Sequence, residues 1–179
     1  MAVASGGSRA CARPGLLGGS VGSLARGRIR PVSDACLVRI SGEPESSITI
    51  EVLGRMHPGS SDFYDGNWLV SPISIAAGGF TGTVAAGLRS EELRSFRREL
   101  ERLHESTGGE ASLCSMETWI DLRVSVEPRG QLKVVGTMVD EPGTGNLLKF
   151  TLDGLDLSFV PGIVRGLSRI ESVYPVLGE

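Results

Sequence analysis

The segment of residues 57–67, HPGSSDFYDGN, holds the side chains best suited to acid–base chemistry. His57 could act as a base, and Asp62 and Asp65 supply carboxylates a few residues away, which together are the groups that proton transfer needs. Short acids in such Gly- and Ser-rich loops more often bond their own backbone. No nucleophile motif such as G-x-S-x-G accompanies the loop. The sequence therefore favours a solvated turn, and a small enzyme or ligand-binding module using His57, Asp62 and Asp65 is the alternative.

The cysteines and histidines do not follow a metal-ligand pattern. Cys11, Cys36 and Cys114 show no C-x-x-C spacing, and His57 and His104 show no H-x-x-x-H spacing, so we expect no metal site. Cys36 and Cys114 fall in strand-like segments, which predicts small buried thiols. His104 lies near the end of a predicted helix, where an imidazolium interacts favourably with the helix dipole.

The segment of residues 140–146, DEPGTGN, contains a short glycine motif. Gly143 and Gly145 lack the third glycine or the Gly-Lys-Ser/Thr ending of a phosphate loop, and a strand pattern follows instead of a helix. Asp140 and Glu141 therefore belong to a predicted hairpin turn. We expect neither a cofactor nor a catalytic residue in this chain.

The longest patterned stretch, residues 68–104, is predicted to be a hairpin followed by a helix. Apolar residues recur at alternate positions on both sides of Gly78 and Gly79, which predicts two strands joined by a tight turn. Pro72 has no backbone N–H, so we expect it at a sheet edge or a bulge. Ser90 is the predicted N-cap of the helix. The apolar stripe of the helix consists of Leu93, Phe96, Leu100 and Leu103.

Gly- and Pro-containing turns separate the remaining strand patterns. Neighbouring strands joined by short turns pair antiparallel. The sequence therefore predicts an α+β domain, with an antiparallel meander of about seven to eight strands and two amphipathic helices on one face. Strands are expected near residues 36–40, 48–52, 111–116, 119–126, 132–138 and 148–152, and a second helix near 163–170. The open face, toward water or a partner, would carry Thr49, Glu51, Asp121, Arg123, Gln131 and Lys133.

The charge of the chain changes sign near residue 33. Residues 1–33 contain five arginines and no acidic residue, whereas the remainder carries 13 basic against 21 acidic residues, a formal charge of −8. The first 33 residues are rich in Gly, Ser, Ala and Arg and lack periodicity, which predicts a disordered tail before a single domain of residues 34–179. An organelle transit peptide and an over-extended translation start are the other interpretations. No apolar run approaches the roughly 20 residues of a membrane span.

Several blocks of the sequence resemble, in their order and spacing, the WapI-type family of bacterial immunity proteins. The blocks are DGNWL (65–69), AGGFTG (77–82), LRSEELRSFRREL (88–100), Trp119 with Leu122, and DEPGTGNLLKF (140–150). The resemblance extends from about Ile48 to Tyr174 and leaves the Arg-rich first 33 residues as an addition. It implies a non-enzymatic protein that binds and neutralises a cognate toxin domain in the cytoplasm. For the namesake of the family, that toxin is a nuclease acting on tRNA.

The resemblance implies a protein partner, with no direct contact to nucleic acid or membrane, and it transfers no catalytic residue. A domain of formal charge −8 suits a basic nuclease, because opposite charges speed association and select partners. We therefore expect the partner surface among the carboxylates of Asp62, Asp65, Asp121, Asp140 and Glu141.

Overall fold

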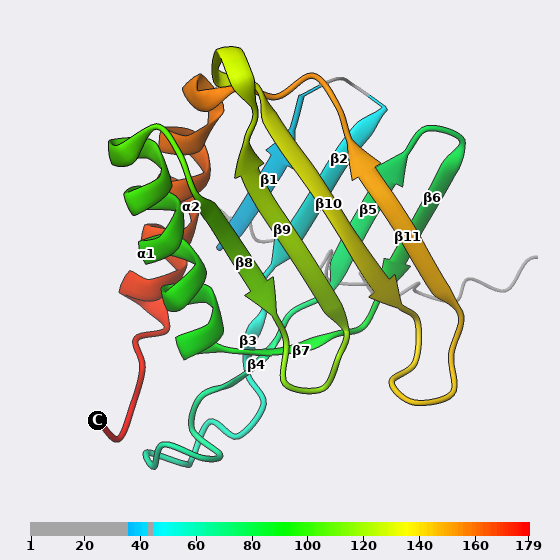
Figure 1. Cartoon of the computed structure of the whole chain (residues 1–179). Coiled ribbons are helices and arrows are strands. Elements are labelled where there is room, and N and C mark those ends of the chain that lie inside the picture. The colour runs from blue at the N-terminus through cyan, green and yellow to red at the C-terminus, as the bar shows by residue number, and fades with distance from the viewer. Residues whose placement is uncertain (1–35, 43–44) are drawn as a thin grey trace, which may run out of the picture. The chain divides into compact units, whose positions relative to one another are not determined.

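Antiparallel strands and two α-helices make up the part of the chain that the computed structural model describes, residues 36–42 and 45–179 (Figure 1). The α+β class predicted from the sequence is thereby confirmed. The predicted tail of residues 1–33 lies outside the described residues. No described helix is long and apolar enough to cross a membrane.

The strands are divided over three sheets, which differs from the single predicted meander. One sheet has the order β1-β2-β5-β6, with β1 (Leu37–Ser41), β2 (Ser46–Glu51), β5 (Ile73–Ala77) and β6 (Phe80–Val84). A second has the order β11-β10-β9-β8, with β8 (Glu110–Cys114), β9 (Ile120–Val126), β10 (Leu132–Val139) and β11 (Leu147–Leu152). The short strands β3 (Gly54–Arg55), β4 (Trp68–Val70) and β7 (Gly87–Arg89) form the third.

The predicted hairpin is present, but each of its arms runs through two sheets. Next to the turn, where Gly78 has a φ of 58° that glycine adopts without strain, β5 pairs with β6. Further from the turn, β4 pairs with β7 in the third sheet. Ser71 and Pro72 separate β4 from β5, and the backbone N–H of Ser71 still donates to Ala86 O at 2.9 Å across the gap. Pro72 therefore lies between two strands, because its missing N–H interrupts the ladder.

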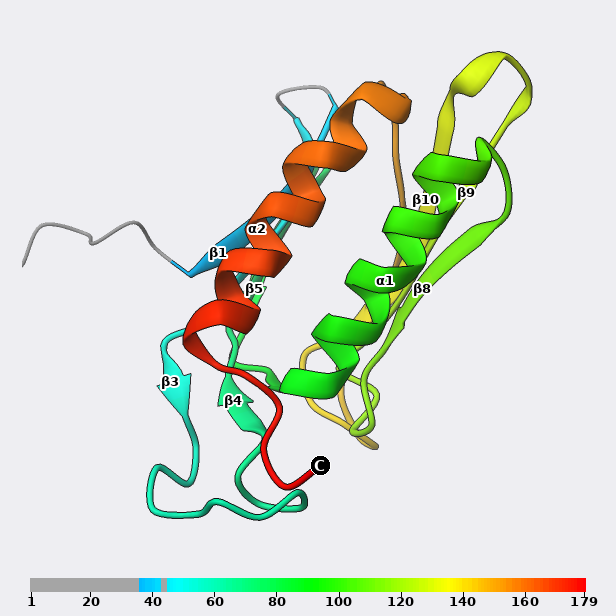
Figure 2. The same cartoon turned by 90° about the vertical axis from the view of Figure 1, so that its left-hand side faces the viewer.

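The helices α1 (Ser90–Ser106) and α2 (Val160–Val173) lie side by side (Figure 2). They do not share one sheet: α1 packs chiefly against β8, and α2 packs against β1. Gly166 permits the close approach of α2, because a Cβ there would come within 3.1 Å of Leu37 O. The Nε of Arg97 in α1 donates to Glu171 in α2 at 2.8 Å.

A single hydrophobic core receives side chains from both four-stranded sheets and from both helices. The predicted stripe of α1 is confirmed, since all four of its residues are buried. The stripe of α2 consists of Val160, Ile163, Leu167 and Ile170, which are buried in the same cluster.

The polar face predicted as one surface is divided between the two four-stranded sheets. Thr49 and Glu51 belong to β2, whereas Asp121 and Arg123 belong to β9 and Lys133 belongs to β10. The predicted burial of the thiols is also wrong for Cys114, which is exposed. Alternation along a strand identifies two faces, but it does not say which strands are neighbours.

Candidate partner-binding surface

Three connecting segments lie at the same end of the described domain, at the bottom of Figures 1 and 2. They are residues 56–67 between β3 and β4, residues 115–119 between β8 and β9, and residues 140–146 between β10 and β11. We call them together the loop end. Four of the five predicted partner-binding residues belong to it, namely Asp62, Asp65, Asp140 and Glu141, and all four are exposed. The fifth, Asp121, lies just outside the loop end, as the second residue of β9.

Asp62 shapes the loop of residues 56–67. Its Oδ1 accepts hydrogen bonds from the backbone N–H of Tyr64 at 2.8 Å and of Asp65 at 2.9 Å. These two hydrogen bonds lower the pKa of Asp62, and the bond from Asp65 has the larger effect. His57 adds a smaller electrostatic contribution in the same direction. Asp62 therefore stays a carboxylate, and its bonding is that of a turn-forming acid.

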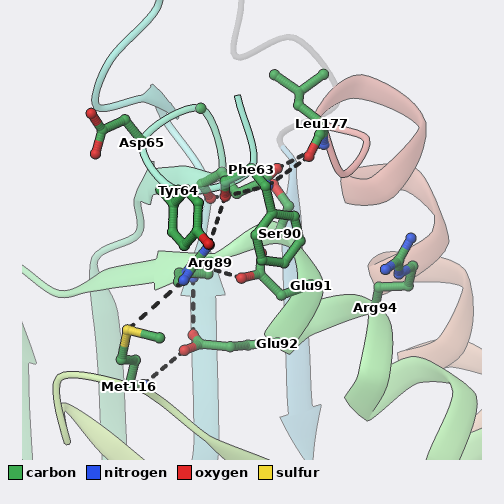
Figure 3. A network of polar contacts seen from close by, with 12 residues as sticks. Phe63, Tyr64, Asp65, Arg89, Ser90, Glu91, Glu92, Arg94, Met116 and Leu177 are labelled. Atoms are coloured by element: carbon green, nitrogen blue, oxygen red, sulfur yellow. Dashed lines mark hydrogen bonds and ion pairs between the residues drawn. The ribbon is translucent and has the colours of Figure 1, made fainter. Parts of the chain in front are cut away.

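A buried guanidinium lies beneath this loop (Figure 3). Arg89 is only 5% exposed, and its Nη2 donates to Phe63 O at 2.7 Å. Its central carbon lies 5.1 Å from the centroid of the Phe63 ring and 5.5 Å from that of Trp68, within cation–π range. Its charge is paired with Glu91, at 2.6 Å between Nε and Oε1. Arg89 thus fixes the loop to the junction of β7 and α1.

The C-terminal segment is also hydrogen bonded to this loop. The side-chain amide of Asn67, a fully buried residue, donates to Phe63 O at 2.9 Å and to Leu177 O at 3.1 Å, while its carbonyl accepts from the N–H of Leu177 at 2.9 Å. Arg55 donates to Gly66 O and, at 2.5 Å, to Pro175 O. The chain around residues 175–177 therefore supports the loop end without belonging to it.

Glu92 ties the turn of residues 115–119 to the start of α1. Its two carboxylate oxygens accept from the backbone N–H of Arg89 at 2.9 Å and of Met116 at 2.7 Å. Burial raises the pKa of Glu92, opposed by these two hydrogen bonds. The predicted N-cap is thus wrong by one residue: Arg89 precedes the helix, Ser90 is its first residue, and Glu92 binds the cap backbone from the third helical position.

Two large exposed side chains, Tyr64 and Met116, lie at this end. Tyr64 is 76% exposed and Met116 is 64% exposed, and the sulfur of Met116 accepts a long contact from Arg89 Nη1 at 3.8 Å. Tyr64 packs edge to face on Phe63, with 6.0 Å between the ring centroids, and Figure 3 labels both of these residues and Met116. The sequence reasoning missed them, because neither exposure nor the nearness of residues 89 and 116 has a local pattern.

The turn of residues 140–146 is the hairpin that the sequence predicted, because it joins the paired strands β10 and β11. Asp140 accepts from the backbone N–H of Asn146 at 2.6 Å and from its side-chain amide at 2.8 Å. Asn146 thereby holds the pKa of Asp140 below its usual value. Gly143 has a φ of 84°, which explains the glycine at this position.

Asp121 has a different environment from the loop acids. Its Oδ1 accepts a contact from Cys114 Sγ at 3.4 Å and lies 3.6 Å from Arg123 Nε. Partial loss of hydration, and then the hydrogen bond to Asp121, raise the pKa of the exposed Cys114 thiol. Asp121 is therefore shared among its sheet neighbours.

Among the described residues, no three His, Cys, Asp or Glu side chains gather in a way that could hold a metal ion. Comparison with curated proteins gives no match. The model of the immunity protein WapI-like family matches residues 39–175, which include every segment of the loop end. That match spans well over half of the chain, and the chain therefore belongs to the immunity protein WapI-like family.

Proposed function

We propose that this chain protects its cell by binding a cognate toxin domain in the cytoplasm and neutralising it without catalysis. The observation that carries the proposal is the family match over residues 39–175. Immunity of this kind is stoichiometric, so the protein needs a complementary surface and no reacting group.

We place the partner surface at the loop end. Its exposed carboxylates Asp62, Asp65, Asp140 and Glu141 belong to a segment, residues 34–179, of formal charge −8. Such a surface suits a basic domain, and nucleases are basic because they bind phosphate backbones. A nuclease toxin is therefore the partner class that we propose.

Tyr64 and Met116 supply the apolar contacts of this surface. Interface energy is concentrated in a few aromatic and other large side chains surrounded by polar ones. Both residues are exposed, and both lie on segments that hydrogen bonds from Arg89 and to Glu92 hold in place. A surface ordered in advance loses little conformational entropy when it binds.

The loop of His57, Asp62 and Asp65 is better explained by binding than by acid–base catalysis. The Asp62 carboxylate already accepts two backbone hydrogen bonds, and the bonding to Asp65 lowers its pKa. A general base works best with a pKa near the operating pH. The hydrogen bonds that Asp62 accepts lower its pKa and so move it further from neutral pH.

Co-expression of this chain with the toxin domain encoded beside it tests the proposal, with cell growth as the measurement. We expect rescue by the wild type and, equally, by a triple variant His57→Ala, His104→Ala, Cys114→Ala, because the carboxylates and the large exposed side chains that we assign to the binding surface include none of these groups. Tyr64→Ala should weaken the complex by about tenfold or more, as expected for an interface anchor, whereas Phe159→Ala, which truncates a 37% exposed ring outside the loop end, should leave the affinity of the folded variant unchanged.

Two results would contradict this assignment. Loss of rescue by a His57→Ala variant that still folds and still binds the toxin domain would support the enzyme alternative. Absence of both rescue and complex formation with every neighbouring toxin domain would refute the immunity role.

A further inference from the structure

Each of the two four-stranded sheets has one edge strand that a helix covers and one that no described helix covers. The edge strand β1 is covered by α2, and the edge strand β8 is covered by α1. The opposite edges, β6 and β11, have no further strand beside them among residues 36–42 and 45–179. Figure 1 shows these two strands on the side of the domain away from the helices.

Between these two edges lies a mainly apolar cleft of about 410 Å³. Core-facing residues of both sheets line it, among them Ile75 and Val84 from one sheet and Met138 and Leu148 from the other. Phe80 points to the same face of β6 as Val84, yet it is 68% exposed. Part of the face that should be covered by the core is therefore open on this side.

The backbone of β6 offers unpaired groups along the cleft. β5 and β6 are joined by the two-residue turn of Gly78 and Gly79, so the flanking residue Phe80 is hydrogen bonded to β5 and the bonding alternates from there. The N–H and C=O groups of Thr81 and Thr83 consequently point away from β5.

An uncharged edge of this kind is a template for another strand. Proteins usually protect an edge strand with a charged side chain or a covering element. β11 carries the exposed Lys149, whereas β6, with the sequence Phe-Thr-Gly-Thr-Val, carries no charge. Of the two open edges, β6 is therefore the better one for pairing.

We propose that β6 pairs with an extended segment of the toxin partner, which adds a strand to the β1-β2-β5-β6 sheet and covers the cleft. Inward apolar side chains of that segment would contact Phe80 and Leu148. A Lys or Arg beside them would lie near Asp140, which is one of the residues that line the cleft and also belongs to the loop end. This inference deepens the proposed function and rests on it.

Charge argues against a second copy of this domain as the occupant. Residues 34–179 carry a formal charge of −8, so a second copy of this domain pairing edge to edge would bring like charges together, whereas a basic segment is attracted. The basic residues 1–33 of this chain are the other candidate, and the experiment below separates them from the toxin.

The test replaces Gly82, whose Cβ position faces the cleft with no atom within 4 Å. Gly82→Lys should fold normally and weaken binding of the toxin domain by about tenfold or more, because it puts a side chain and a positive charge in the way. Ser74→Lys is the matched control, since it places the same charge on the opposite, exposed face of the same sheet. We expect this control to bind within about twofold of the wild type.

Residue-resolved amide exchange on the wild-type full chain provides the second measurement. Complex formation should slow exchange at Thr81 and Thr83 strongly, and at Gly82 little, because Gly82 is already bonded to β5. Equal toxin binding by Gly82→Lys and wild type, or unchanged exchange at both threonines, would overturn the strand pairing and leave the immunity role intact. Neutralisation of no toxin by the wild type would overturn both.

Two further outcomes would name a different occupant and reject the proposal. If removal of residues 1–33 speeds exchange at Thr81 and Thr83 in the free protein, the chain's own segment fills the cleft. If the protection rises with protein concentration together with a dimer mass, a second copy fills it.

Discussion

Replacing Arg89 by methionine should destabilise the protein and loosen the loop end. Arg89→Met keeps a long unbranched side chain that can still contact Phe63 and Trp68, but it removes the positive charge and the hydrogen bond to Phe63 O of 2.7 Å. A hydrogen bond involving a charged group contributes about 1.5–3 kcal/mol. The partly buried Glu91 carboxylate also loses its partner at 2.6 Å, and removing one member of a buried pair costs about 3–5 kcal/mol when burial is complete.

These two contributions overlap and are reduced by remaining solvent access to Glu91, so we expect a loss of about 2–4 kcal/mol in the free energy of unfolding. Arg123→Met is the matched control: its side chain is 56% exposed and its ion pairs are 3.6 and 3.9 Å long, so it should cost less than about 1 kcal/mol. Arg89→Lys should fall between them, because lysine keeps the charge but not the planar fork.

Urea unfolding measures the loss, and amide exchange measures where it acts. The Arg89→Met variant should exchange faster across residues 60–67 and at Met116, with little change in the middle of β10, whose residues pair with β9 and β11. Equal urea midpoints for Arg89→Met and Arg123→Met would refute the assignment of Arg89 as the anchor of the loop. Faster exchange spread evenly over the whole domain would show instead that Arg89 supports global packing only.

Four further predictions concern the core, the tail and the response to pH. Phe96→Ala removes a fully buried ring and should cost about 3–5 kcal/mol, against less than about 0.5 kcal/mol for the exposed Arg98→Ala; similar urea midpoints would contradict the core face assigned to α1. A chain starting at Ser33 should keep the melting temperature of the full chain, and a drop of several degrees would mean that residues 1–33 pack on the domain. Asp140 has a lowered pKa in the folded state, so its ionised form adds stability above the unfolded pKa of about 3.9, and this is lost as the pH falls through the folded pKa. Asp140→Asn should therefore destabilise at pH 7 and match the wild type in strong acid, whereas a constant difference at both pH values would reject this linkage. Glu92 acts in the opposite direction: its raised pKa makes its contribution decline as the pH rises from about 4.3 to its folded pKa, so Glu92→Gln should reduce that decline in urea midpoints, and an unchanged decline would contradict the prediction.

Local patterns predicted several elements correctly. The spacing of Leu93, Phe96 and Leu100 predicted the buried face of α1, because a helix repeats every 3.6 residues wherever it is placed. The adjacent Gly78 and Gly79 predicted the turn between β5 and β6, since few other residues adopt the required backbone angles. The acids of residues 62 and 140 were predicted in turns, and both bond their own loops.

Other features depended on contacts between distant segments. The arms of one hairpin lie in two sheets, with β4 pairing to β7 and β5 pairing to β2, although alternation continues almost unbroken through Pro72. Cys114 has the pattern of a strand residue, yet it lies on the exposed face. Burial of a strand face depends on which element covers it. The five or so residues of the strand itself do not identify that element.

Periodicity, turn chemistry and the order of its sequence blocks by themselves determined the class of this fold, the buried face of α1 and the family. Only the tertiary structure decided which strands share a sheet, which edges the helices leave open, and that Arg89 lies beneath a loop more than 20 residues earlier in the chain. The physical reason is that a local pattern reports how one segment meets a generic apolar surface. Which segments pack together depends on how all such surfaces compete for burial. The outcome is decided only when the whole chain is packed.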